Sequence, residues 1–147
     1  RRAGHLMRQR RSVLGLYWYN VAVIPLITLV LVARPWPRGA GGGWWLVIVA
    51  LLAQAALTQR VIRPWTGRVS AAPLPRAMAT MYLAIGLAEL VPFLTLVLGR
   101  FRLDVAAPWA AAGVGATWVL EVAATLPFLR RILASLESEP SGTAPPS

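Results

Sequence analysis

Cysteine and lysine are missing from this chain, and histidine occurs once, at His5 in a basic N-terminal arm. The absence of cysteine excludes disulfides, thiolate metal sites, iron–sulfur clusters and thiol catalysis. One histidine outside the apolar segments cannot supply a bis-histidine haem or a histidine-rich metal site. Acidic residues are also scarce, with five Asp and Glu among 147 residues. We therefore expect no metal and no other cofactor.

Hydrophobic residues make up 57% of the sequence, charged residues make up 14%, and the mean hydropathy is +0.60. A soluble domain is less apolar than this. The fifteen basic residues are all arginine and give a net charge of +10. They lie between apolar runs and form no basic patch interleaved with aromatic residues, which argues against nucleic-acid binding. We expect them to contact the anionic headgroups of a lipid bilayer.

Four apolar runs cover residues 13–33, 44–62, 77–99 and 105–129. Each is close to the ~20 residues that a helix needs to cross the hydrocarbon core of a membrane. The first run is longer than the roughly 7 to 15 apolar residues of a signal peptide, and no small-residue cleavage site follows it, so we expect it to be retained. The sequence thus predicts an all-α integral membrane protein with four transmembrane helices.

The arginines are divided unequally between the two ends of these predicted helices. Eleven lie in the N-terminal arm, in the middle connection and after the fourth run, whereas four lie in the other two connections. Because positive residues favour the cytoplasmic side, both termini are expected in the cytoplasm. The use of arginine for lysine with much Ala, Gly, Pro and Trp suggests a bacterial source, so the expected location is the bacterial inner (plasma) membrane.

A gapless shift of 67 residues lays the first two apolar runs on the last two. Pro25 then falls on Pro92, and Gln54 falls on Glu121. Matched proline and polar residues are less common by chance than matched apolar residues. We predict two tandemly repeated hairpins in the same orientation, related by an axis near the membrane normal.

These patterns divide the chain into five segments. They are a basic cytoplasmic arm (1–12), a first transmembrane hairpin (13–63), a cytoplasmic connection (64–76), a second transmembrane hairpin (77–136) and a tail (137–147). The tail, ESEPSGTAPPS, is polar and rich in proline and serine. That composition predicts disorder.

Each predicted helix carries one polar residue far from its ends: Asn20, Gln54, Glu89 and Glu121. At about 1.5 Å of rise per residue, the two glutamates could share one layer of the bundle. A carboxyl group in hydrocarbon costs several kcal/mol unless it is protonated, paired or wetted. We expect each glutamate to bond to an amide such as Gln54 or Asn20, to bind a cation, or to pair with a charge of another subunit. The alternative is a protonated glutamate that only links helices.

Two prolines, Pro25 and Pro92, predict helix kinks within the membrane. Pro92 has no N–H group, so the carbonyl of Ala88 loses its helical donor directly beside Glu89. Freed carbonyls beside a buried carboxyl group bind protons or sodium in transporters. Many proline kinks only shape the packing of membrane helices, and this alternative stays open.

The fourth predicted helix carries Thr117, Glu121 and Thr125 at a spacing of four residues, which places them on one face. Polar residues on one face of a membrane helix face other helices. We expect this stripe to contact either the rest of the bundle or a partner subunit.

The stretch from Gly86 to Pro92, GLAELVP, is similar to the carboxylate motif of the proteolipid subunits of rotary ATPases. Their duplicated forms also keep a membrane glutamate in the second hairpin. In this chain Glu121 lies in the second hairpin, and the neutral Gln54 occupies the matching position in the first. The resemblance covers only these short stretches and implies a proton-binding carboxyl group. The first helix of such a hairpin is rich in glycine, whereas residues 13–33 contain only Gly15. This departure argues against assembly into a proteolipid ring.

No nucleophile, phosphate loop or catalytic carboxylate pair is recognisable at an aqueous surface, so we expect no enzymatic activity. The function predicted first is that of a small accessory or structural subunit that packs against a larger bacterial inner-membrane complex, for example a respiratory, photosynthetic, transport or secretion complex. The alternative is a homo-oligomeric transport unit that moves protons or a small cation past Glu89 and Glu121. A sensor or anchoring module is a third possibility.

Overall fold

The computed structural model describes residues 1–36, 42–69, 72–103 and 105–138. These residues form helices and no strands: α1 (Arg2–Val32), α2 (Trp44–Leu57), the π-helix η1 (Thr58–Ile62), α3 (Arg63–Val69), α4 (Leu74–Phe101) and α5 (Ala107–Ser138). The segments α2, η1 and α3 follow one another without a break. The described chain therefore has four continuous helices that are long and apolar enough to cross a membrane, which confirms the prediction of an all-helical fold with four spans.

The helices extend beyond the apolar runs. The helix α1 begins at Arg2, so the basic arm is the first part of that helix. The helix α3 continues through Val69 into the expected connection. At the other end, α5 runs to Ser138, two residues into the segment expected to be disordered. Residues 139–147, together with Arg38 and Asp104, lie outside the described residues.

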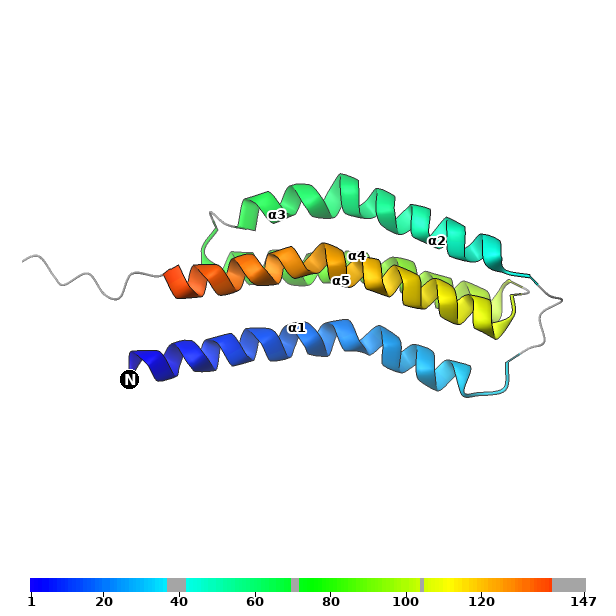
Figure 1. Cartoon of the computed structure of the whole chain (residues 1–147), viewed down its shortest axis with the longest axis horizontal. Helices are drawn as coiled ribbons and strands as arrows, with labels where there is room; N and C mark the ends of the chain where they lie inside the picture. Colours follow the sequence, from blue (N-terminus) through cyan, green and yellow to red (C-terminus); the bar gives the residue numbers. More distant parts are fainter. Residues whose placement is uncertain (37–41, 70–71, 104, 139–147) are drawn as a thin grey trace, which may run out of the picture.

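The second hairpin forms the centre of the bundle (Figure 1). Its helices α4 and α5 pack against each other along their length, and α5 contacts every other helical segment. The helices α1 and α2 each contact α4 and α5, but no described residue of α1 lies close to α2. The first hairpin is thus open and the second is closed. The two hairpins do not pack alike, so their equivalence as repeats stays a prediction from the sequence.

Part of the buried set recurs at the 67-residue offset, whereas the buried Ile85 and Leu96 match the exposed Trp18 and Leu29. Helical positions separated by three or four residues share one face. The matched pairs in which both side chains are buried include Tyr17 with Ala84, Val21 with Ala88, Ala50 with Thr117, Gln54 with Glu121 and Ile62 with Leu129.

Two glycines allow α4 and α5 to approach closely. A Cβ atom on Gly113 would lie 3.1 Å from Thr95 Cγ2, and one on Gly99 would lie 3.2 Å from Ala110 Cβ. Small residues at such crossings favour helix association in lipid, where no hydrophobic force draws the helices together. These crossings hold α4 and α5 side by side.

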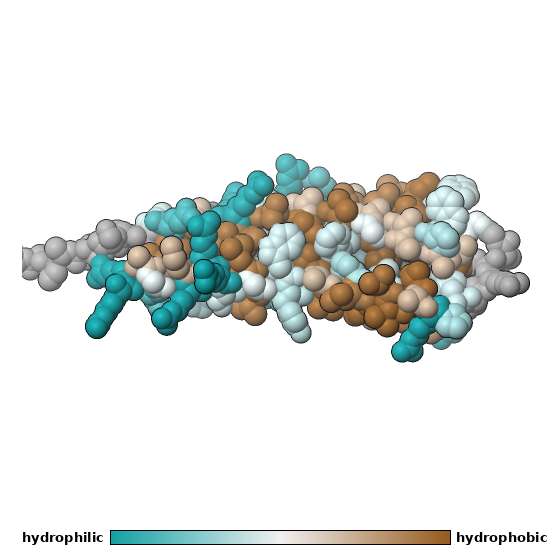
Figure 2. Space-filling model, turned by 60° about the horizontal axis from the view of Figure 1, so that its bottom comes forward, coloured by the Kyte–Doolittle hydropathy of each residue, from teal (hydrophilic) through white to brown (hydrophobic). Residues whose placement is uncertain are grey.

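The two ends of the bundle differ in chemistry. The start of α1, the end of α3 and the end of α5 lie at one end, where hydrophilic side chains gather, while the middle of the surface is hydrophobic (Figures 1 and 2). We call this end, which carries Arg8, Arg63, Arg68 and Arg131, the basic end. The hydrophobic middle is the surface expected to face lipid.

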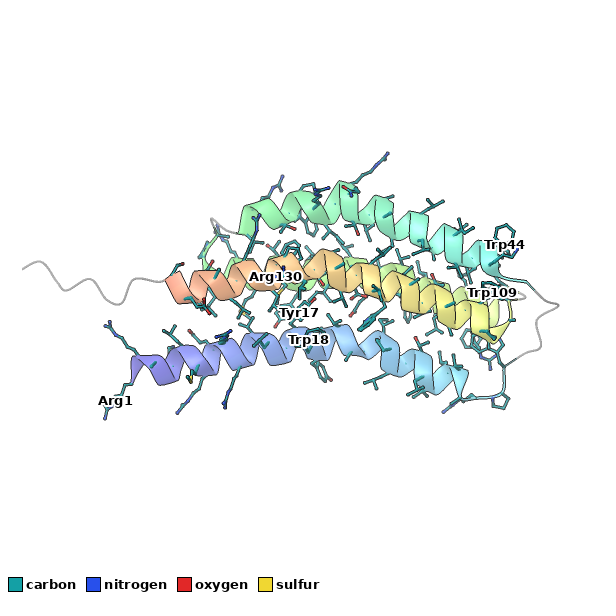
Figure 3. The ribbon with its side chains drawn as sticks, viewed as in Figure 1. Arg1, Tyr17, Trp18, Trp44, Trp109 and Arg130 are labelled. Atoms are coloured by element: carbon teal, nitrogen blue, oxygen red, sulfur yellow. The ribbon has the colours of Figure 1, made fainter. Side chains whose placement is uncertain are left out.

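Tryptophans mark the opposite end, where Trp44 and Trp109 lie close together in Figure 3. Here Trp36 Nε1 donates a hydrogen bond to Val105 O at 3.1 Å, and Arg100 Nη2 donates one to Pro35 O at 2.8 Å. The Arg100 guanidinium also lies 5.0 Å from the centroid of the Trp36 ring. These contacts join the α1–α2 connection to the α4–α5 hairpin. We call this end the tryptophan end.

Candidate functional site

Glu121 lies on the inward face of α5, which contacts both α2 and α4. The buried residues Thr117, Glu121 and Thr125 follow one another at a spacing of four residues, as the sequence predicted for one helix face. This face points into the bundle of the chain itself, not toward a partner. The side chain of Glu121 has no exposed surface.

Glu89 on α4 stands next to Glu121. The two carboxyl groups lie close enough to interact directly. Glu89 is partly buried, and its Oε1 atom is enclosed without a hydrogen bond of good geometry to any described residue. The same holds for both carboxyl oxygens of Glu121. The structure thus brings together two glutamates that the sequence placed only at similar depth.

Gln54 on α2 reaches the backbone beside this pair. Its Nε2 atom donates a hydrogen bond to Ala88 O at 3.2 Å, the carbonyl that lacks a helical donor because of Pro92. This bond uses one of the two N–H groups of the Gln54 amide, so the expectation that Gln54 also bonds to a glutamate carboxyl group stays a prediction. The Oε1 atom of Gln54 is buried without a partner among the described residues.

Asn20 does not take the part expected of it. Its Nδ2 atom donates to Leu16 O on its own helix at 2.8 Å, and its side chain is only partly buried. A short amide side chain within a helix often bonds to the carbonyl one turn earlier. Asn20 therefore links no helices through this bond.

Pro25 frees the carbonyl of Val21, and this carbonyl accepts a hydrogen bond of 2.8 Å from Trp118 Nε1 on α5. The sequence indicated the freed carbonyl but not its donor. Trp118 was missed because an indole in a membrane helix is more often interfacial. Only the packing of α1 against α5 brings it to Val21.

A chain of hydroxyl groups leads from α1 to the backbone of Glu121. Thr125 Oγ1 donates to Glu121 O at 2.8 Å, so Tyr17 is the donor in its bond of 2.9 Å to Thr125 Oγ1. Figure 3 shows Tyr17 between α1 and α5. Thr117 Oγ1 bonds in the same way to Gly113 O at 2.8 Å. The hydroxyl groups of the stripe are thus used by backbone carbonyls, and neither donates to the carboxyl group of Glu121.

Two hydroxyl groups are also buried without a partner among the described residues: Thr58 Oγ1 and Tyr82 OH. Thr58 follows Gln54 by one helical turn, and Tyr82 precedes Glu89 by two turns. Because α2 and α4 run in opposite directions, both atoms lie on the basic-end side of the glutamate pair. Sequence reasoning missed Tyr82, whose spacing of seven residues from Glu89 was the available signal.

A cavity of about 490 Å³ opens at the basic end beside Thr58. One wall is formed by Thr58, Ile62, Arg63 and Gly67 of the second helix, and the other includes Ala124 and Arg131 of α5. We call it the π-helix cavity, since η1 lines it. Thr58 and Ala124 each lie within about one helical turn of Gln54 and Glu121 respectively, so the cavity extends toward the glutamate pair.

The ligand atoms at this site limit what the glutamate pair can bind. Among the described residues, no group of three or more His, Asp or Glu side chains could hold a metal ion. Two carboxyl groups and one amide oxygen suit a proton or a single small monovalent cation better than a divalent metal, which takes more charged oxygen ligands. Comparisons with protein families, with curated proteins and with solved structures gave no match to this chain.

Proposed function

We propose that Glu89 and Glu121 together bind one proton or one small monovalent cation, and that a homo-oligomer of this chain carries it across the membrane. The observation that supports this most is the buried Glu121 carboxyl group, which stands beside a second carboxyl group and receives no hydrogen bond from an N–H or hydroxyl group of the described residues. Two ionised carboxylates so close together repel each other strongly in a medium of low dielectric constant. A shared positive charge removes that repulsion.

The unpartnered hydroxyl groups of Thr58 and Tyr82 support a route from the basic end. Each hydroxyl group can donate a hydrogen bond to a water molecule or accept one from it. Such water molecules would lie between the basic end and the glutamate pair. Thr58 also lines the π-helix cavity, which supplies space for water. Because four helices rarely enclose an aqueous path alone, the proposal requires two or more copies of the chain.

Reconstitution into lipid vesicles tests the transport proposal. The wild-type protein is expected to dissipate an imposed pH or cation gradient. Glu121→Gln and Glu89→Gln each keep the size of the side chain but remove its charge, and each is expected to lower the flux by roughly tenfold or more. The matched control is Glu137→Gln, because Glu137 is exposed and pairs with Arg10 at 3.5 Å far from the bundle interior.

Unchanged flux in both the Glu89 and the Glu121 variant would refute the mechanism. The same vesicles identify the cation when sodium is replaced by a large organic cation at constant pH gradient. A flux that persists indicates protons, whereas a flux that stops indicates sodium.

We also propose an association with a larger bacterial inner-membrane complex as a second candidate function. A separate groove of about 290 Å³ runs between α1 and α5, and its walls include Pro25, Leu29, Gly115 and Trp118. A side chain on Gly115 would meet no other atom within 4 Å. Small residues beside an open apolar groove favour the close approach of another membrane helix.

Purification in mild detergent tests this second candidate. An accessory subunit is expected to co-purify with a defined set of membrane proteins, and Gly115→Leu should release them because it fills the groove. The Gly86→Leu variant is the matched control, since Gly86 is also open but lies on α4 outside the groove. A chain that always purifies without other subunits would count against this function.

A further inference from the structure

The π-helix cavity has a structural cause in two interrupted helices. The π-helix η1 ends at Ile62, two residues before Pro64, and the Arg63 N–H bonds to Thr58 O, five residues back. A proline both lacks a donor and crowds the carbonyl four residues earlier, and a wider turn relieves this crowding. On the facing wall, α5 contains Pro127. The two helices therefore leave space between them at this level.

Small side chains keep the space open. Gly67 lines the cavity, and a Cβ atom on it would meet no atom within 4 Å. The facing residues of α5 include Ala123 and Ala124. A π-helical turn is rare and occurs frequently at functional sites. We therefore consider the cavity as a binding site in its own right.

Two guanidinium groups line the cavity and are oriented by uncharged acceptors. Arg63 Nη1 donates to Gln59 Oε1 at 3.0 Å, and Arg131 Nη1 donates to Thr66 O at 2.7 Å. None of the described residues that line the cavity is acidic. The Gln59 amide orients the Arg63 guanidinium without cancelling its charge. Arginines held in this way are well suited to bind the oxygen atoms of a phosphate group.

Apolar side chains also line the cavity. They include Ile62, Ala124 and Pro127, with Thr58 next to them in the lining. The stretch from Thr58 to Gly67 is about 13 Å long at the usual helical rise. The lining thus combines two guanidinium groups with apolar side chains, which matches a phosphate group attached to an apolar body.

We propose that the π-helix cavity binds a phosphate group, carried by the headgroup of an anionic phospholipid or present as a free phosphate. Its ligands, Arg63 and Arg131, differ from those of the proposed proton or cation site, although the cavity is also part of the proposed water route to the glutamate pair. Bound phosphate bridges the second helix and α5 through Arg63 and Arg131. This role differs from the general attraction of arginine to anionic membranes, because it depends on the cavity and not on total charge.

Binding to the full chain in phosphatidylcholine nanodiscs tests the proposal. Phosphatidylglycerol or inorganic phosphate is added, and bound lipid is counted by native mass spectrometry while thermal stability is followed in parallel. Arg63→Gln is expected to lower the affinity about tenfold, since it removes one charge-assisted contact. Arg60→Gln is the matched control: Arg60 is exposed in the same π-helical turn but does not line the cavity. Gly67→Leu fills the cavity without removing charge and should lower the affinity as well.

Each outcome of this experiment either supports the phosphate site or contradicts it. Selective retention of phosphatidylglycerol that Arg63→Gln or Gly67→Leu weakens supports a lipid headgroup site. Stabilisation by inorganic phosphate that the same variants abolish supports a free phosphate site. Equal loss of binding in Arg60→Gln and Arg63→Gln, together with unchanged binding in Gly67→Leu, would overturn the proposal, because binding would then follow total charge alone.

Discussion

Two backbone carbonyl groups show how single side chains join the helices of this bundle. Val21 O and Ala88 O each lie four residues before a proline and occupy the same position in the predicted repeat. Each accepts a hydrogen bond from another helix, from Trp118 and Gln54 respectively. A carbonyl without a donor in hydrocarbon costs free energy. The prolines thus create acceptors that favour inter-helix contacts.

Trp118→Phe tests this at the residue scale. The change keeps an aromatic ring but removes the donor to Val21 O, so the free energy of unfolding should fall by about 0.5 to 1.5 kcal/mol. Denaturant titration in detergent micelles measures it. Trp44→Phe is the control, since Trp44 is largely exposed. Equal effects of the two substitutions would contradict a structural role for the indole N–H of Trp118.

At the scale of whole elements, the contact between α5 and its neighbours depends on Gly113. A Cβ atom there would come within 3.1 Å of Thr95 Cγ2 on α4 and 3.8 Å of Val47 Cα on α2. Gly115, only two residues later, faces open space. Substitutions at the two glycines therefore distinguish the effect of close packing of α5 from the effect of its intrinsic helix propensity.

Gly113→Leu is expected to destabilise the bundle by roughly 1 to 3 kcal/mol, because a large side chain must push α5 away from α4 and α2. Gly115→Leu should be neutral or stabilising by up to about 1 kcal/mol, because leucine favours a helix more than glycine does. The same unfolding titration compares them. A loss of stability as large in Gly115→Leu as in Gly113→Leu would show that the close approach at Gly113 is not the cause.

At the scale of the whole molecule, the basic end and the tryptophan end predict one orientation in the membrane. Arginine-rich ends stay in the cytoplasm, and indole rings prefer an interface. Arg68 lies at the basic end and Arg102 follows α4 at the other end. Because the chain contains no cysteine, single cysteines report the side of each position without interference.

We expect Arg102→Cys to react with a membrane-impermeant maleimide added outside intact cells. Arg68→Cys should react only after the cells are permeabilised. Both residues are exposed, so unequal access to the thiol does not explain the difference. Labelling of Arg68→Cys from outside would reverse the proposed orientation.

Local patterns in the sequence were sufficient for much of the fold. The lengths of the apolar runs determine that four helices can cross a membrane, because a spanning helix must satisfy its backbone hydrogen bonds within itself. The stripe of Thr117, Glu121 and Thr125 indicated which face of α5 turns inward, since side-chain spacing along a helix is regular. Pro25 and Pro92 indicated where carbonyl groups lose their donors. Each of these properties depends on residues within a single helix.

Only the tertiary structure decided which helices are neighbours. Three features depend on contacts between helices: the open first hairpin, the closeness of Glu89 to Glu121, and the hydrogen bond from Gln54 to Ala88 O. Apolar side chains gain almost nothing by leaving lipid for another helix, so hydropathy does not specify neighbours. Neighbours are instead selected by close packing at positions such as Gly99 and Gly113 and by donors that reach freed carbonyls, and both require the complete three-dimensional arrangement.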